Sequence, residues 1–314
     1  MSGTIDAIGL VGSVLGIVGF FENLVPAAPP DRGATVRVKL GLSDDDDGAQ
    51  IDGTIDAIYA WDINNNYLGQ SGGSYIKEGD IHDFIIDQDS GGTRSEYVGL
   101  AAANNALCIA WITVSQLDNT RGGAWTGDIG YNCGNDWYPS TEPAGKLDNG
   151  DRYIPYCSWL DADHSNDLPY AAMKFSTYSY GDGITDTNDN SRACDATIFG
   201  RDQGPISGKP AKRSRGLKPR QPWMERQLIV SSLAEHYAEI VCSSDTSWGP
   251  DFVGSDGMFC DMGTKTLSPL CSTEEVDGCV NINTTDNTVS KLSSVAKRQV
   301  EMSYKTYDKI KQWS

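Results

Sequence analysis

EYVGLAAANNALCIAWITVSQ, residues 96–116, decides the fold class of this 314-residue chain. Two apolar runs flank Asn104-Asn105, and asparagine is a residue that turns accept readily. Short apolar runs bounded by turn residues are typical of β-strands. We therefore predict two strands here, joined at the asparagine pair, inside a β-rich domain.

The sequence on both sides continues this pattern. TVRVKLGL alternates with period two from Thr35 to Leu42, and Asn64 to Asn66 in WDINNNYLGQ predict a hairpin turn. Further strands are predicted in TIDAIYAWDI from Thr54, IHDFIID from Ile81, AAMKFSTYSY from Ala171 and ATIFG from Ala196. Short strands at close spacing, with no long helical pattern between them, predict a mainly β protein built on an antiparallel β-sandwich.

The eight cysteines fall into two sets of four. The first set is Cys108, Cys133, Cys157 and Cys194, and the second is Cys242, Cys260, Cys271 and Cys279. Each even set predicts a separately disulfide-bonded domain, although either set allows three pairings. No C-x-x-C motif supports a zinc site. An oxidising compartment is therefore favoured, so we expect a secreted or cell-surface protein, and a sequon at Asn283 agrees with glycosylation.

The boundary between the two sets is basic, although the chain has a formal net charge of −18. Its prolines and glycines forbid a continuous helix, so we expect an exposed linker. Lys212-Arg213 within it is the type of pair that kexin-like proteases of the secretory route recognise, and a merely solvated linker is the alternative. The acidic remainder of the chain would repel phosphate backbones, so no nucleic-acid partner is expected.

The first residues contain an uncharged run, IGLVGSVLGIVGFF, from Ile8 to Phe21. It is shorter than the roughly 20 residues that a transmembrane helix needs, and no positive region precedes it as in a signal peptide. Four glycines share one helical face and would let another backbone approach closely: Gly9, Gly12, Gly16 and Gly19. Three interpretations stay open: a helix docked on its own domain, a helix that self-associates or enters a membrane, and an atypical leader.

These observations divide the chain into four parts. Residues 1–33 are predicted to form the glycine-striped helix and a proline-rich linker, and residues 34–200 the sandwich. Residues 201–226 form the basic processing linker. Residues 227–314 form a small disulfide-rich α+β domain, in which QLIVSSLAEHYAEIVCSS begins as a strand and becomes a helix near Ala234.

Two stretches of the predicted sandwich carry candidate ligand residues. Alternating oxygen ligands suit Ca²⁺, and the best such pattern is Asp161, Asp163, Ser165 and Asp167. It lacks the glycine and glutamate of an EF-hand, so solvated turns are favoured over a loose calcium site, and no other cofactor is expected. Residues 124–140 are dense in aromatic residues that could stack on a sugar or anchor a partner: Trp125, Asp128, Tyr131, Trp137 and Tyr138. The favoured alternative is that Trp125 and Trp137 cap the core near a Cys133 disulfide.

Several motifs together resemble a group of largely uncharacterised fungal secreted proteins. These motifs are Trp125-Thr126-Gly127-Asp128, Cys133-Gly134, Trp137-Tyr138, Cys157-Ser158-Trp159-Leu160-Asp161, Ser247-Trp248-Gly249-Pro250-Asp251 and Phe259-Cys260-Asp261-Met262. The resemblance covers most of residues 34–280. It implies secretion and processing at the linker, and it implies no particular chemistry.

Enzymatic chemistry has little support in this sequence. The chain has three histidines, neither GDGITD nor GPISG is a nucleophile elbow, and no phosphate loop or H-E-x-x-H motif is present. We therefore favour a non-enzymatic, proteolytically processed protein that acts by self-association or membrane contact, as toxins and effectors do. A carbohydrate-binding or carbohydrate-active sandwich that uses the 124–140 aromatic residues is the alternative.

Overall fold

The computed structural model describes Pro26 and residues 32–41, 52–89, 91–118, 120–146, 152–189, 193–207, 219–295 and 298–314. The four glycines of the N-terminal stripe and the Lys212-Arg213 pair lie outside these described residues. The chain divides into two compact units, residues 1–214 and residues 215–314. Each described unit is mainly β, as predicted for the first; the sequence predicts an α+β second unit, whereas its described helices are only four and six residues long.

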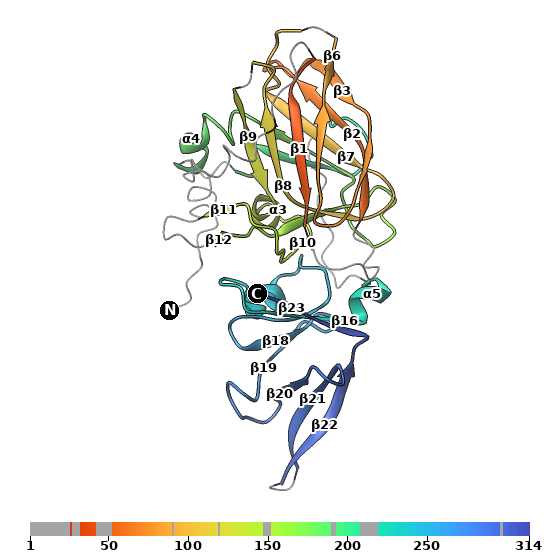
Figure 1. The fold of residues 1–314 in the computed structure, drawn as a ribbon, viewed down its shortest axis with the longest axis vertical. Helices are drawn as coiled ribbons and strands as arrows, with labels where there is room; N and C mark the ends of the chain where they lie inside the picture. The colour runs from red at the N-terminus through yellow and green to blue at the C-terminus, as the bar shows by residue number, and fades with distance from the viewer. Residues whose placement is uncertain are drawn as a thin grey trace. The chain divides into compact units, whose positions relative to one another are not determined.

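The first unit contains two large antiparallel sheets among its described residues (Figure 1). The first has the order β10-β13-β8-β1-β5, with β9 also paired to β8, and the second has the order β15-β14-β7-β2-β3-β6, with β4 also paired to β2. The strands of the first sheet are β1 (Thr35–Leu40), β5 (Ile81–Ile85), β8 (Leu107–Ser115), β9 (Arg121–Thr126), β10 (Trp137–Tyr138) and β13 (Cys157–Leu160). Those of the second are β2 (Gly53–Trp61), β3 (Tyr67–Ser71), β4 (Ser74–Ile76), β6 (Asp87–Gln88), β7 (Tyr97–Ala102), β14 (Ala172–Ser176) and β15 (Thr197–Gly200).

Shorter elements complete the first unit. The strands β11 (Gly145–Lys146) and β12 (Arg152–Tyr153) pair with each other, and the short helices are α3 (Gly127–Asn132) and α4 (Ile184–Asp189). The core is one apolar cluster to which both sheets contribute alternate residues, among them Val36 and Ile112 from the first and Ile58 and Leu100 from the second. This is the inward alternation expected of a sandwich.

The decisive stretch forms β7 and β8, as predicted, but these strands belong to different sheets. The asparagine turn therefore carries the chain from one sheet to the other instead of closing a hairpin. Strand β8 is central in its sheet and every one of its nine residues is buried. Burial on both faces explains why its sequence is an apolar run rather than a strict alternation.

The predicted hairpin turn at Asn64 to Asn66 is confirmed. Strands β2 and β3 are antiparallel, and Asn65 has φ +65°. The Asp62 carboxylate fixes the turn, because Oδ1 accepts the backbone N–H groups of Asn64 at 2.9 Å and Asn66 at 2.8 Å. Asparagine is among the few residues that tolerate this left-handed conformation.

The cysteines pair within their two sets, as the sequence predicts. All eight lie in the described ranges and none is free. In the first unit Cys108 pairs with Cys157 and Cys133 pairs with Cys194. In the second unit Cys242 pairs with Cys260 and Cys271 pairs with Cys279. No disulfide therefore joins the two units.

The second unit contains a five-stranded sheet and a three-stranded sheet among its described residues. The five-stranded sheet has the order β19-β18-β17-β16-β23, with β16 parallel to both of its neighbours, and the second sheet has the order β20-β21-β22. Their strands are β16 (Gln227–Ser231), β17 (Asp251–Val253), β18 (Met258–Asp261), β19 (Thr266–Pro269), β20 (Val280–Asn283), β21 (Thr288–Val295), β22 (Arg298–Thr306) and β23 (Lys309–Trp313). The helices are α5 (Pro222–Glu225) and α6 (Ala238–Ser243), so the predicted helix begins four residues after Ala234.

Two glycines with positive φ allow a matched test of packing in the first unit. Gly123 on β9 has φ +79°, and a Cβ there would lie 2.3 Å from the Thr177 carbonyl oxygen. Gly92 has φ +89°, and a Cβ there would have no atom within 4 Å. We expect Gly92→Ala to cost about 1–2 kcal/mol through backbone strain alone. Gly123→Ala should cost roughly a further 1–3 kcal/mol through overpacking. Urea unfolding of the two variants checks this, and equal losses would contradict the close approach.

Candidate functional site

The aromatic residues of the 124–140 stretch are inside the first unit rather than on an open loop. Residues 127–132 form helix α3, and Trp125, Trp137 and Tyr138 are fully buried. The Tyr131 ring lies 4.6 Å from that of Trp137, centroid to centroid, in edge contact. The buried rings agree with the favoured interpretation, in which Trp125 and Trp137 cap the core, and Tyr131 is half-buried beside them.

Close backbone approach explains this burial. A Cβ on Gly130 would lie 2.2 Å from Ser158 Oγ on β13, and one on Gly127 would lie 2.1 Å from the Tyr156 carbonyl oxygen. The glycines therefore let α3 lie directly against β13. Asp128 is buried as well, and it accepts hydrogen bonds from the Tyr153 hydroxyl and, at 2.9 Å, from the Tyr156 N–H. Burial and this carboxylate together raise the pKa of Tyr153.

The acidic residues 161–167, which are the candidate calcium ligands, differ in their surroundings. Asp161 is fully buried, and among the described residues neither of its carboxylate oxygens has a hydrogen-bond partner. Burial and the neighbouring Asp163 raise the pKa of Asp161 to about 6. Asp163 instead accepts the N–H of Ser165 at 2.9 Å, and Asp167 is an exposed turn residue with φ +56°. Within the described ranges no group of three or more His, Cys, Asp or Glu side chains could hold a metal ion.

The densest polar cluster lies in the second unit, at two aspartates of adjacent strands. Asp251 begins β17 and Asp261 ends β18. The register of this antiparallel pair, with Phe252 opposite Cys260, brings the two aspartates opposite each other at its end. Two carboxylates in this arrangement repel each other unless donors and cations are supplied.

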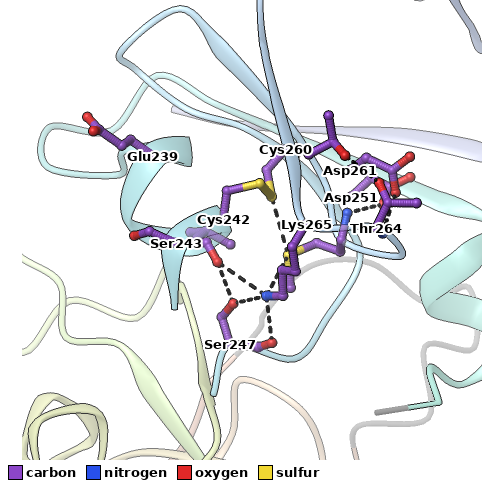
Figure 2. The surroundings of a disulfide bond; sticks show 12 residues. Glu239, Cys242, Ser243, Ser247, Asp251, Cys260, Asp261, Thr264 and Lys265 are labelled. Carbon is purple, nitrogen blue, oxygen red and sulfur yellow. Dashed lines mark hydrogen bonds between the residues drawn. A yellow bond between two sulfur atoms is a disulfide. The ribbon is translucent and has the colours of Figure 1, made fainter. Parts of the chain in front are cut away.

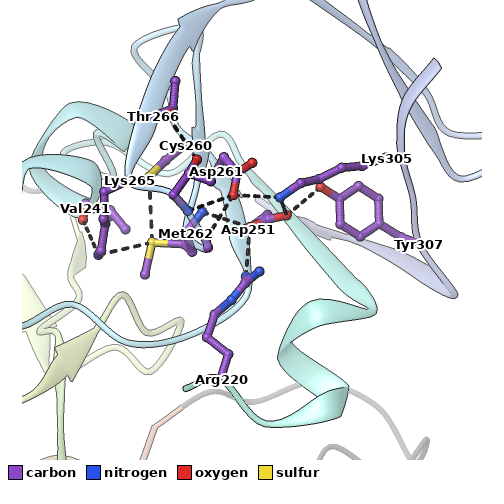
Figure 3. Close-up of polar contacts among 12 residues, drawn as sticks. Arg220, Val241, Asp251, Cys260, Asp261, Met262, Lys265, Thr266, Lys305 and Tyr307 are labelled. Carbon is purple, nitrogen blue, oxygen red and sulfur yellow. Dashed lines mark hydrogen bonds and ion pairs between the residues drawn. The ribbon is translucent and has the colours of Figure 1, made fainter. Parts of the chain in front are cut away.

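Asp251 receives four donors (Figure 3). Its Oδ1 accepts from Arg220 Nη1 and from the Met262 N–H, both at 2.8 Å. Its Oδ2 accepts from Lys305 Nζ at 2.8 Å and from the Tyr307 hydroxyl at 2.7 Å. The side chain is 1% exposed, so these four bonds replace the water that the carboxylate has lost.

Asp261 is enclosed in the same way. Lys305 Nζ lies 2.7 Å from its Oδ1, which also accepts the Gly263 N–H at 2.9 Å, and the Tyr304 hydroxyl donates to Oδ2 at 2.6 Å. Burial alone would raise the pKa of Asp261, but the bonds from Lys305 and Tyr304 outweigh it and lower the pKa. Burial and the Asp261 hydrogen bond raise the pKa of Tyr304 to about 12.

This cluster holds several chain segments together. The charges of the two aspartates balance those of Arg220 and Lys305, and the donors occupy the lone pairs that a substrate or cation would need. It joins the residues before α5, both aspartate strands and the end of β22. In the sequence, Asp251 and Asp261 stand out only as members of the SWGPD and FCDM motifs. No local pattern connects them with Lys305 or Tyr307, which lie more than 40 residues further along the chain.

Lys265 forms a second polar contact beside the Cys242–Cys260 disulfide (Figure 2). Its Nζ donates to the carbonyl oxygens of Val241 at 3.3 Å and Ser247 at 3.0 Å. Val241 lies in the last turn of α6, where carbonyl groups lack helical partners. Lys265 therefore caps this helix with a positive charge, which also suits the helix dipole.

Ser231 and His236 are the described pair that most resembles a nucleophile and its base. Ser231 Oγ lies 2.9 Å from His236 Nδ1, and both side chains are buried. His236 Nε2 has no partner among the described residues, so no carboxylate orients the ring as in a catalytic triad. The ring packs instead between Phe252 and Trp313. The arrangement favours a packed interior histidine.

Breaking the Asp251 cluster should destabilise the second unit strongly. We expect Asp251→Asn to cost about 3–5 kcal/mol, because it leaves the Arg220 charge buried without its partner. Asp308→Asn is the matched control, since Asp308 pairs with Arg226 at 3.6 Å in an exposed position and the pair should contribute little. Denaturant unfolding followed by tryptophan fluorescence measures both, and similar losses would contradict the assignment of Asp251 as the structural centre.

His236 should make the second unit sensitive to acid. Burial lowers the pKa of His236 to about 4, whereas an unfolded histidine titrates near 6.5. The unfolded state therefore binds the proton first, so the stability that is present above pH 6.5 is lost as the pH falls towards 4. The loss amounts to about 3 kcal/mol. Unfolding free energies at several pH values should show this loss in the wild type and in His82→Gln, but not in His236→Gln.

No model of a known protein family matches this chain, and no curated protein is significantly similar to it. Within the described residues no helix is long and apolar enough to span a membrane. What the structure establishes is a mainly β protein of two compact units, each closed by its own pair of disulfides.

Proposed function

We propose that this chain is a secreted, proteolytically processed, non-enzymatic protein that acts by self-association or membrane contact, in the manner of a toxin or effector. The observation that carries the proposal is the disulfide pairing. Two bridges close the first unit, two close the second, and none crosses the basic linker between them. Cleavage of the linker would therefore release two covalently separate units.

Secretion is supported by the state of the cysteines. Four disulfides with no free thiol are the pattern of proteins that mature in an oxidising compartment. The sequon asparagine, Asn283, is exposed at the turn between β20 and β21, where a glycan would meet no packed side chain. Its Nδ2 donates to the Asp286 carboxylate at 2.8 Å.

The cleavage step is supported by what lies downstream of Lys212-Arg213. Pro219 and Arg220 form contacts within the second unit. The Trp248 indole N–H donates to the Pro219 carbonyl oxygen at 3.0 Å, and Arg220 pairs with Asp251. Proteolysis at the dibasic pair would leave these anchors in place. The second unit would then keep its fold after processing, as an activation step requires.

A non-enzymatic role is supported by the condition of the polar side chains. The Asp251 cluster is satisfied and charge-balanced, and the Ser231–His236 pair is buried. Of the rings on which the carbohydrate alternative depends, those of Trp125, Trp137 and Tyr138 are buried in the first unit, and that of Tyr131 is half-buried against Trp137. A sugar would need an exposed ring face, so we favour the first proposal.

Mass spectrometry of the intact protein from its producing cells tests the processing step. We expect two fragments that meet near Lys212-Arg213 and that separate without reductant, since no disulfide links the units. A Lys212→Ala, Arg213→Ala variant should remain a single chain. Fragments that separate only after reduction, or an uncut wild-type chain, would count against the proposal.

Liposome leakage with the processed protein tests membrane contact. Leucines at Gly12 and Gly16 would fill the small-residue face of the N-terminal stripe, so we expect Gly12→Leu, Gly16→Leu to leak at least tenfold more slowly. Val14→Leu changes the opposite helical face by one methylene and is the matched control. Equal leakage from all three proteins would remove the stripe from the mechanism.

A further inference from the structure

Strand β22 leaves one long edge of the second unit open. It is nine residues long and stands last in the order β20-β21-β22, so β21 occupies one of its edges. No described strand pairs with the other edge (Figure 1). An open edge presents unpaired N–H and C=O groups in a row, and such a row is a template for another strand.

The side chains on this edge strand are apolar on one face. Val300, Met302 and Tyr304 are 44%, 50% and 37% exposed. Val300 and Met302 are two residues apart and therefore point to the same side. Tyr304 stands where the register of β21 and β22 shifts, and its hydroxyl group donates to Asp261. Lys291 of β21, opposite Met302, lies with its Nζ 5.3 Å from the Tyr304 ring centroid. Three large exposed apolar side chains in five residues favour association with another surface.

The two charged side chains of residues 300–306 form contacts with groups of their own unit. The Glu301 carboxylate accepts hydrogen bonds from Ser290 Oγ and, at 3.2 Å, from Asn281 Nδ2, so it lies across its own sheet. Lys305 is held by Asp251 and Asp261 at 2.8 and 2.7 Å. Glu301 stays exposed in these contacts, whereas the Lys305 side chain is 23% exposed.

We propose that the open edge of β22 pairs with β22 of a second copy of this chain, antiparallel about a two-fold axis at Met302. This register sets Val300 opposite Tyr304 of the partner subunit and Met302 opposite the partner subunit's Met302. Glu301 then faces the partner's Ser303, so no two like charges oppose each other. The three-stranded sheets of the two copies join into one of six strands.

The neighbouring symmetric registers are less favourable. An axis at Glu301 would bring two identical carboxylates face to face, which is destabilising. An axis at Ser303 would pair Met302 with the partner's Tyr304 but would leave Val300 opposite a threonine. Only the axis at Met302 matches all three exposed apolar side chains with one another, and a two-fold contact of this kind is closed, so it gives dimers rather than filaments.

This contact goes beyond the proposed function, because it uses neither the glycine stripe nor the linker. It lies wholly in the second unit and would survive cleavage at Lys212-Arg213. It also supplies a form of self-association that a processed fragment could retain. The dimer contact and the membrane-active stripe can therefore fail independently of each other.

Analytical ultracentrifugation of the full chain over a concentration series tests the contact. We expect the wild-type mass to double with concentration. Met302→Lys and Met302→Glu should each remain monomeric, because each sets two like charges against each other at the axis. An equimolar mixture of the two should dimerise again through the opposite charges. Ile63→Lys, at a 72% exposed position in the β2–β3 turn, is the control and should dimerise like the wild type.

The outcomes separate this contact from the other proposals. A wild-type chain that stays monomeric at every concentration overturns it, as does a Met302→Lys chain that still dimerises. Loss of the dimer in Gly12→Leu, Gly16→Leu, with no effect of Met302→Lys, would assign association to the stripe and overturn the β22 contact. Met302 is half exposed, and circular dichroism confirms that each variant is folded before its mass is interpreted.

Discussion

Burial of the Asp251 carboxylate is the constraint on which the second unit depends. A charge removed from water needs a donor for each lone pair, and the donors to Asp251 come from residues before α5, from the turn after β18, from β22 and from Tyr307. The strands of the unit therefore take their final positions together. The apolar cluster of this unit is small, and its two disulfides and this charge network supply what a larger core would otherwise contribute.

The first unit is stabilised mainly by apolar packing. Its two sheets bury a continuous cluster of aliphatic and aromatic residues, and Cys108–Cys157 fastens the central strand β8 to β13. The buried polar group Asp128 is satisfied by neighbours within 28 residues of chain. The two units thus depend on different long-range contacts. The second unit depends on charge pairs between distant residues, and the first depends on packing between its two sheets.

The strands and turns could be predicted because their causes are local. Alternation identifies β1, a run of apolar residues identifies β8, and Asn65 marks the hairpin by its tolerance of positive φ. The assignment of β7 and β8 to different sheets could not be predicted, because either connection satisfies the same local pattern. The burial of Trp125 and Trp137 depends on how closely α3 approaches β13. The glycines of α3 permit this approach, but their presence in the sequence does not by itself predict it.

The charge network was beyond local reasoning for a different reason. Asp251 and Lys305 are 54 residues apart, and an acidic residue beside a tryptophan motif has the same sequence signature whether it is solvated or buried. Their pairing has a consequence at the surface. By pairing with Lys305, the network turns one charge of the edge strand β22 inward, whereas Glu301 stays exposed and bonds Ser290 of the neighbouring strand. The second unit is therefore stabilised in part by a lysine that would otherwise help to keep its edge strand apart from other strands.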